Sequence, residues 1–573
     1  MRAHHARQAH TESRGARMTS TVSRVRAAYA RIEAVARPEI WIDLRPRQEV
    51  EAEARAIDAR VAAGENLPLA GRLLAVKGNI DVYGLPTTAG CPAYAYDPGA
   101  DAPVVARLRA AGALVLGTTN LDQFATGLVG TRSPYGPVRS AHDPDRVSGG
   151  SSSGSAVAVA LGIVDLALGT DTAGSGRVPA AFNGIVGLKP TRGLVPTAGV
   201  VPACASIDCV TMLARTLPEA EQALSYMACP PAREVPGLPR RAPGPWRIAI
   251  PPLTQLGELD EGWPEAYEAA VTRLSEAGAE IREIDLSAFT EAAAMLYEGA
   301  FVAERYTAVG SFIDKLISEG GEGLDPTVTG IITRAREIPA HRLFTDQDRL
   351  AALRARALAE MADADALLLP TAPGHPTLAE VAADPLTSNA RLGRFTNSTN
   401  LFDLAAVAVP AGQANGGPFG VMLTGPAFTE DRLTRIARTL EPQASLAVVG
   451  AHLTGQPLNL QLLALGAHLD RTTTTAPVYR LYALQTTPPK PGLVHAGEDG
   501  AAIETEIWHL PTEGLGRLLT TLPRPMTLGT VELSDGTRVP GFLCEPEALQ
   551  TAEDITHHGG WRTFLKHRAD RRP

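Results

Sequence analysis

The chain has 573 residues, of which 45% are hydrophobic, and a formal net charge of −9. This length exceeds one ordinary domain and predicts two or three, and the apolar fraction is sufficient to build hydrophobic cores. The acidic balance, without a clustered basic face, argues against nucleic acid as the main partner. No apolar run reaches the ~18–20 residues of a membrane-spanning helix, so no membrane partner is expected.

The cysteines and the first residues indicate the cellular compartment in which the chain is expected. The five cysteines contain no C-x-x-C pair and are too sparse for a disulfide framework. We therefore expect a reduced, cytoplasmic chain with no zinc or other metal and no cofactor. The first 17 residues are basic but lack the apolar core of a secretory signal. We interpret residues 1–17 as a disordered tail or a misassigned start, with Met18 as the expected beginning.

The predicted elements follow from apolar spacing. Helical spacing predicts helices within residues 20–64 and over most of residues 262–360. Between residues 70 and 210, short apolar runs alternate with turns that carry Gly and Pro, which predicts strands alternating with helices. A Pro- and Arg-rich stretch at 229–246 indicates an exposed loop, and late core strands are expected at 366–373 and 404–412.

The pattern resets near residues 441–446. Five later runs predict further strands: LAVVG, PVYRLYAL, AIETEIWHL, GTVEL and RVPGFLCEP. We therefore predict an α/β fold at residues 18–441 and a smaller, mainly β domain at residues 446–573.

Lys77 lies in the apolar frame LLAVKGNI of a chain that strongly prefers arginine. Only five of its 53 basic residues are lysine. A buried amine can lose its proton whereas an arginine cannot, so a base is the one role in which arginine could not replace Lys77. A lysine at a strand end whose amine reaches solvent is the alternative that this argument leaves open.

Two serine-bearing, Gly-rich turns lie on either side of one apolar run. Ser151 follows Gly149-Gly150, and Ser175 follows Ala173-Gly174. Serine is a weak nucleophile and needs a base, which predicts a proton relay from Ser175 through Ser151 to Lys77. Alternatives are a flexible or phosphate-binding loop, although the P-loop pattern is missing, and a serine–histidine pair formed only in space.

The second turn also offers backbone donors. The N–H groups of Thr172, Ala173, Gly174 and Ser175 can point at a substrate carbonyl oxygen and form an oxyanion hole. The glycine lets the backbone approach the substrate closely.

Several blocks between residues 65 and 412 resemble the amidase signature family. They are LAVKGNIDVYGLPTTAG, GTTNLDQFATG, RVSGGSSSGSAVAVA, GTDTAGSGRVPAAFNGIVGLKPTRG and LLLPTAP. The resemblance implies a mixed sheet covered by helices, with Lys77 as general base, Ser151 as bridging serine on a cis peptide bond and Ser175 as acyl-enzyme nucleophile. Gly78 stands where the family often has Asp, and Gln123 where it often has Glu.

Within that family the chain resembles the allophanate hydrolases, in DQFATGLVGTRSPYG, in YEGAFVAERY and in having a second domain. The resemblance implies that Tyr297 and Arg305 hold a substrate carboxylate. Eight residues are just over two helical turns, so on one helix both side chains can face one pocket. A surface ion pair of Arg305 with Glu304 or Glu298 is the alternative.

The implied reaction is hydrolysis of allophanate to ammonia and N-carboxycarbamate. The second domain resembles the γ-glutamyl cyclotransferase-like domain of these enzymes, but VVGAHLTGQPLN lacks the serine of the cyclotransferase turn. The resemblance implies a role in decarboxylating N-carboxycarbamate, for which His452 is the candidate, with a structural or surface histidine as the alternative. His468 repeats the GAHL sequence but is expected on a helix.

Other functions remain open from the sequence. They are a general aliphatic amidase, a component of a glutamine-dependent transamidation enzyme, and a binding protein with an inactive amidase fold. For allophanate hydrolysis, a separate urea carboxylase is the expected metabolic partner, and the resemblance implies a homodimer.

Overall fold

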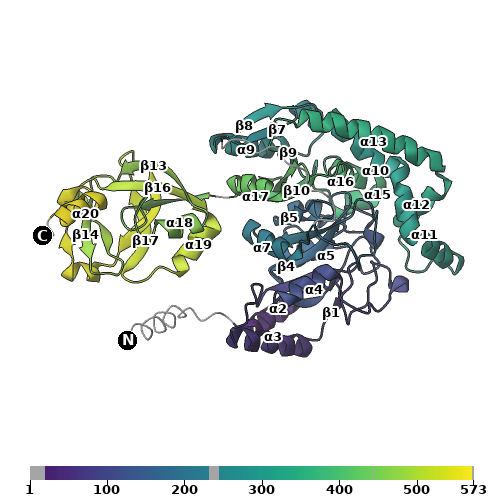
Figure 1. Ribbon diagram of the computed structural model, residues 1–573, viewed down its shortest axis with the longest axis horizontal. Coiled ribbons are helices and arrows are strands. Elements are labelled where there is room, and N and C mark those ends of the chain that lie inside the picture. The colour runs from purple at the N-terminus through teal and green to yellow at the C-terminus, as the bar shows by residue number, and fades with distance from the viewer. Residues whose placement is uncertain (1–19, 231–243, 442, 571–573) are drawn as a thin grey trace. The chain divides into compact units, whose positions relative to one another are not determined.

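The computed structural model describes residues 20–230, 244–441 and 443–570, and the chain divides into two compact units at Leu440/Glu441 (Figure 1). The expected tail at 1–17 and most of the loop predicted at 229–246 lie outside the described residues. Among the described helices, none combines the length and apolar character needed to span a bilayer.

The first unit is built on one large sheet. Its strands are β1 (Trp41–Leu44), β2 (Leu73–Lys77), β3 (Leu114–Thr119), β4 (Leu166–Asp171), β5 (Val186–Lys189), β6 (Cys209–Ala214), β7 (Arg247–Ile250), β8 (Glu280–Glu283), β9 (Ala366–Pro370), β10 (Ala405–Ala414) and β11 (Gly417–Gly425). They form an 11-stranded sheet in the order β1-β3-β2-β4-β6-β5-β10-β11-β9-β7-β8. Strand β2 pairs in parallel with β3 and β4, and β4 pairs antiparallel with β6, so the sheet is mixed.

Helices lie between the strands of this sheet in the chain order (Figure 1). They are α2 (Thr21–Val35), α3 (Arg47–Ala62), α4 (Pro103–Ala110), α5 (Ser153–Ala160), α6 (Arg177–Phe182), α7 (Leu217–Met227), α8 (Leu253–Leu256), α9 (Trp263–Glu276), α10 (Ser287–Glu298), α11 (Ala303–Ser318), α12 (Pro326–Thr333), α13 (Ala340–Glu360), α14 (Leu378–Ala383), α15 (Pro385–Leu392), α16 (Asn397–Leu401) and α17 (Glu430–Ala437). Every residue of β2, β3, β4 and β6 is buried, as expected for continuous apolar strands covered on both faces.

Local sequence explains several of these elements. The hairpin from β10 to β11 turns at Asn415-Gly416, where both residues have positive φ, the conformation that Asn-Gly favours in a two-residue hairpin. The apolar run at 153–160 is a helix whose first seven residues are all buried, and period alone does not separate such a helix from a buried strand. Strand β1 between the first two helices was not predicted.

The second unit is mainly β. Its strands are β12 (Gln443–Val448), β13 (His468–Thr474), β14 (Tyr479–Leu484), β15 (Lys490–His495), β16 (Glu504–Pro511), β17 (Met526–Glu532), β18 (Arg538–Cys544) and β19 (Glu553–Asp554), and its helices are α18 (Asn459–Ala464), α19 (Thr512–Thr520) and α20 (Trp561–Asp570). They form sheets in the orders β13-β16-β12-β18-β17 and β15-β14-β19.

His468 corrects one expectation. It begins β13 and pairs with His509, whereas a helix was predicted there. The helix α18 ends earlier because Gly466 has a φ of 81°, a left-handed conformation that terminates helices and that glycine adopts without a steric penalty.

A buried ion pair fixes the turn that follows β4. The side chains of Asp171 and Arg177 are both fully buried and 2.8 Å apart, and Arg177 also reaches the carbonyl of Thr396 and the amide of Asn400. Burial raises the pKa of Asp171, but the adjacent Arg177 outweighs burial and holds it below its usual value. The pair joins β4, α6 and α16.

Replacing Arg177 by Met leaves the Asp171 carboxylate buried without its cation. We expect the free energy of unfolding of the first unit to fall by about 3–5 kcal/mol, measured by urea denaturation. Arg282→Met is the control because its pair with Asp363 is largely exposed, and it should change little. Equal effects of the two substitutions would contradict the prediction.

Candidate active site

Lys77 is the last residue of β2 and is completely buried. Its Nζ donates hydrogen bonds to Ser151 Oγ and to Thr170 Oγ1, both at 2.7 Å. The parallel register of β2 with β4 brings Thr170 beside it, because Val76 pairs with Leu168. The sequence analysis missed Thr170, and only the pairing of the two strands could have indicated it.

Burial lowers the pKa of Lys77 to about 7, although the carboxylates of Asp122, Asp208 and Asp171 oppose this shift. Arg305 adds to the lowering through charge repulsion. A substantial fraction of the amine is therefore unprotonated near neutral pH. The group can then accept a proton, which an ordinary surface lysine cannot do to a useful extent.

The turn that carries Ser151 is shaped by Asp122. The Gly150–Ser151 peptide bond is cis, and the Asp122 carboxylate accepts the N–H groups of Gly130 and Arg132. A Cβ on Gly150 would lie 2.1 Å from Asp122 Oδ2, so only glycine fits there. The N–H of Asp122 also donates to the carbonyl of Ser151, at 3.2 Å.

Ser175 lies in the turn between β4 and α6 and is 2% exposed. Its hydroxyl donates to the carbonyl of Gly127 at 3.3 Å, and its own carbonyl accepts the N–H of Ser152 at 3.2 Å. Among the described residues, no hydrogen bond joins the Ser175 and Ser151 hydroxyls. The structure thus joins Lys77 to Ser151 directly and Ser175 to the same turn through the backbone.

The expected oxyanion donors are not all available. The N–H of Gly174 donates to Asp171 Oδ1 at 3.0 Å, because the Asp171 carboxylate holds the turn through this group and the N–H of Gly176. The N–H groups of Thr172, Ala173 and Ser175 have no acceptor in the described part of the chain. The Gly174 amide is therefore removed from the predicted set.

Tyr297 and Arg305 meet, but not along one helix as expected. Tyr297 lies near the end of α10 and Arg305 near the start of α11, with the short helix η4 (Ala300–Val302) between them. The helix α10 ends because Gly299 is extended and the next N–H, that of Ala300, donates to Asp346.

Arg305 is 1% exposed, so it is not the surface ion-pair residue of the alternative interpretation. Its guanidinium donates to Tyr297 Oη at 3.2 Å and to Thr126 Oγ1 at 3.0 Å, and its Nε has no hydrogen-bond partner among the described residues. Glu304 accepts instead from Ser206. A buried cation with an unused donor and no carboxylate partner among the described residues is suited to an anionic ligand.

The two departures from the family pattern have structural explanations. A Cβ on Gly78 would lie 2.5 Å from the Ile42 side chain. The Gln123 amide donates to the carbonyls of Gly90 and Gly323 and accepts the N–H of Asp325. An ionised Glu could only accept hydrogen bonds, so glutamine suits this position.

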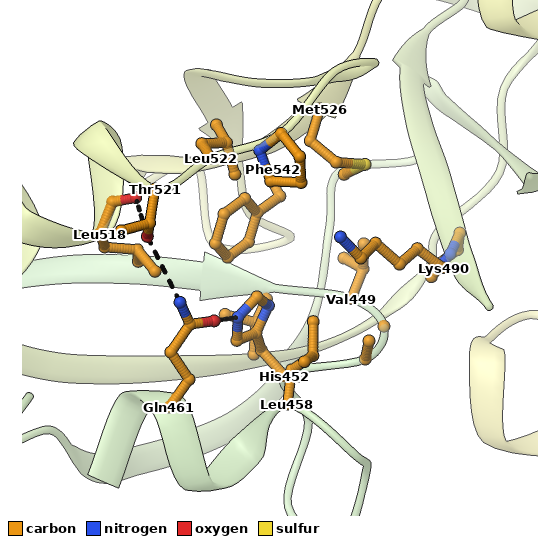
Figure 2. Close-up of a pocket in the computed structure, with 15 residues that line it drawn as sticks. Val449, His452, Leu458, Gln461, Lys490, Leu518, Thr521, Leu522, Met526 and Phe542 are labelled. Atoms are coloured by element: carbon orange, nitrogen blue, oxygen red, sulfur yellow. Dashed lines mark hydrogen bonds between the residues drawn. The ribbon is translucent and has the colours of Figure 1, made fainter. Parts of the chain in front are cut away.

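His452 lines a pocket in the second unit (Figure 2). Its ring stacks on Phe542 with centroids 4.8 Å apart, and its Nε2 bonds to Gln461 Oε1 at 3.0 Å. Figure 2 shows Lys490 extending into the same pocket. Burial lowers the pKa of His452, and Lys490 lowers it further.

No group of three or more His, Cys, Asp or Glu side chains in the described ranges is arranged to hold a metal ion.

Comparisons with known proteins agree along the chain. Residues 23–434 match the Amidase family, and residues 444–566 match the allophanate hydrolase C-terminal domain. A urea amidolyase from Lachancea kluyveri is 42% identical, over 92% of this chain and 31% of that protein. The chain thus spans about a third of the length of the curated urea amidolyases that it matches.

Solved structures are similar as well. An allophanate hydrolase structure from Kluyveromyces lactis is 39% identical with a TM-score of 0.68, over 96% of this chain and 97% of that one. A curated relative with a different activity, the 2-amino-5-chloromuconic acid deaminase of Comamonas testosteroni, is 34% identical, over 70% of this chain and 88% of that protein.

The Lys77 amine should titrate near pH 7, because burial disfavours its charged form. With only five lysines in the chain, NMR of lysine-labelled protein can follow each amine. Lys77→Met identifies the signal, and Lys315, whose side chain is 74% exposed, serves as the reference. A Lys77 signal that titrates with Lys315 would contradict the prediction.

Proposed function

This chain belongs to the amidase family and groups within it with the allophanate hydrolases, and from that premise we propose that it hydrolyses allophanate (urea-1-carboxylate). The observation that carries the substrate assignment is the buried Arg305, with an unused donor and without a carboxylate partner in the described chain. A general amidase for neutral substrates has no need of such a cation.

Ser175 is the proposed nucleophile and Lys77 the proposed base. The unprotonated Lys77 amine, with one N–H directed to Thr170, accepts the Ser151 hydroxyl proton as Ser151 takes that of Ser175. Ser175 Oγ bonds to the terminal amide carbon, and the proton returns to the leaving nitrogen, which departs as ammonia. Water then attacks the acyl-enzyme by the same relay and releases N-carboxycarbamate and Ser175.

The N–H groups of Thr172, Ala173 and Ser175 are the proposed oxyanion donors. Their lack of other acceptors supports this role, since donors already fixed toward the developing oxyanion need no reorganisation during the reaction. The Asp171 carboxylate, which holds the N–H groups of Gly174 and Gly176, keeps the turn in its conformation.

Arg305 and Tyr297 are the proposed carboxylate site. A guanidinium donates two parallel hydrogen bonds to a carboxylate, and the Tyr297 hydroxyl against it keeps the fork oriented. Arg305 is completely buried, so a bound carboxylate interacts with it in a region of low dielectric constant, where the attraction is strong.

Ser175→Ala should abolish ammonia release from allophanate. Arg305→Met should lower kcat/KM for allophanate and for its stable analogue malonamate by about 10- to 100-fold, because a charged hydrogen bond is lost. At a pH above the Lys77 titration, where the base is neutral in both enzymes, the same substitution should leave the slow hydrolysis of propionamide unchanged. If the wild type hydrolysed propionamide but not allophanate, this proposal would be wrong and the chain would be a general amidase.

We further propose that the second unit assists decarboxylation of N-carboxycarbamate in the pocket of His452. The Thr521 hydroxyl donates to the carbonyl of Leu518, so it accepts the Gln461 amide N–H, and the Gln461 oxygen then faces His452 Nε2 (Figure 2). This chain of hydrogen bonds assigns the proton to Nε2 and leaves Nδ1 open.

The ligand and the remaining groups are complementary. Lys490 has no carboxylate partner in the described part of the chain and supplies a positive charge to the pocket. N-carboxycarbamate is a dianion, so its binding favours the protonated ring of His452. Transfer of that proton to the ligand nitrogen breaks the C–N bond and gives carbon dioxide and carbamate.

His452→Ala should leave release of the first ammonia unchanged and let N-carboxycarbamate accumulate, because its decarboxylation would proceed without assistance. Carbon-13 NMR of a reaction with labelled allophanate follows that intermediate directly. The control is His468→Ala, whose residue is exposed on β13. Equal lifetimes of the intermediate in the wild type and in His452→Ala would remove His452 from this step.

Supply and assembly complete the proposal. A separate urea carboxylase would supply allophanate, in keeping with the much longer urea amidolyases that this chain matches over a third of their length. On the family resemblance we also propose a cytoplasmic homodimer, and the free state of all five cysteines is compatible with a reducing compartment.

A further inference from the structure

Asp208 is a buried carboxylate that the steps above do not use. It precedes β6 and lies opposite Thr172, because the antiparallel register pairs Asp171 with Cys209. Its residue is 5% exposed, and no cation lies within ion-pair distance of it among the described side chains. Burying a carboxylate costs free energy unless hydrogen bonds or a counter-charge compensate for the lost hydration.

The hydrogen bonds of Asp208 join two segments of the site. Its Oδ1 accepts the Thr172 hydroxyl, and its oxygens accept the N–H groups of Ala203, at 2.9 Å, and Cys204, at 3.1 Å. Thr172 carries the first of the proposed oxyanion donors. Cys204 in turn lies with its Sγ 4.0 Å from the carbonyl of Phe301, in the short helix between Tyr297 and Arg305.

Asp208 interacts electrostatically with both cations of the site. It favours the charged form of Lys77, and Arg305 favours the charged form of Asp208. Burial nevertheless raises the pKa of Asp208 to about 6, which its hydrogen bonds from Thr172, Cys204 and Ala203 only partly offset. The other charged or titratable groups that act on this cluster are Asp122, Asp171, Glu304, the phenol of Tyr297 and the thiols of Cys204 and Cys209.

We propose that Asp208 is a positioning residue, which holds the oxyanion turn through the Thr172 hydroxyl and supplies a counter-charge to both Lys77 and Arg305. This inference rests on the proposed function. The hydrogen bond from the Thr172 hydroxyl to Asp208, here called the clamp, fixes the direction of the Thr172 and Ala173 N–H groups. The negative charge of Asp208 moderates the repulsion between the two buried cations. The hydroxyl bond and the charge are separable by substitution.

Thr172→Val removes the hydroxyl bond and retains the Asp208 carboxyl group. We expect kcat for malonamate to fall about 10- to 100-fold with KM nearly unchanged, because the turn is misaligned for the transition state. The midpoint of the acid limb of the kcat/KM profile should move less than it does in Asp208→Asn, because loss of the hydroxyl bond weakens the Asp208 charge without removing the group. Thr172→Ser restores the hydroxyl and should recover most of kcat.

Asp208→Asn retains an oxygen acceptor and removes the charge. Without that carboxylate the ammonium form of Lys77 is less favoured, so the acid limb of kcat/KM should move to lower pH. A merely structural role lowers activity without moving the limb. Thermal unfolding of Thr172→Val and Asp208→Asn reports whether each variant folds. If Asp208→Asn does not fold, the comparison of Thr172→Val with Thr172→Ser still tests the clamp.

Two outcomes overturn the proposal: a Thr172→Val enzyme with kcat within twofold of wild type, or a folded Asp208→Asn enzyme with an unmoved acid limb. Failure of the proposed function is distinct, because it shows in the wild type. There malonamate would not be hydrolysed, or Ser175→Ala would retain the activity.

Discussion

The site depends on the cost of burying an ammonium ion. Lys77 ends a strand in the middle of a large sheet, where water does not reach it, and the two hydroxyls that contact it do not replace a full hydration shell. The amine therefore favours its neutral form, and serine chemistry becomes possible without histidine. The carboxylates around it set how far this shift goes, and none of them forms a close ion pair with it.

The topology of the sheet brings the other groups to this amine. The ends of β2 and β4 lie together because the two strands are parallel neighbours, and the start of β6 meets the end of β4 because that pair is antiparallel. Lys77, the turn of Ser175 and Asp208 thus converge from residues far apart in the sequence. The buried pair of Asp171 and Arg177 then fixes the turn against α6 and α16.

From the sequence, the residue types of the candidate site were easier to identify than the contacts between them. Lys77 stood out in a lysine-poor chain, and the serines stood out by their turns, because a residue type and its neighbours are visible in one dimension. Thr170 and Asp208 were missed, since both act through strand pairing that no local pattern encodes. The sequence analysis counted the Gly174 N–H among the oxyanion donors. Its hydrogen bond to Asp171 could not be foreseen, because that bond depends on how the turn folds. Tyr297 and Arg305 were expected on one helix, but that helix ends before Gly299. His468 was expected on a helix but lies in a strand, because Gly466 terminates the preceding helix.

A neutral amine is a nucleophile as well as a base. Carbon dioxide, which the proposed decarboxylation would release, adds to unprotonated amines to form carbamates, and cyanate carbamoylates them in a similar way. Near neutral pH an exposed lysine is protected by its proton, whereas a substantial fraction of Lys77 lacks that protection. Its complete burial beneath the two serine-bearing turns therefore limits access by such small electrophiles, and the enclosure that creates the base also protects it from covalent inactivation.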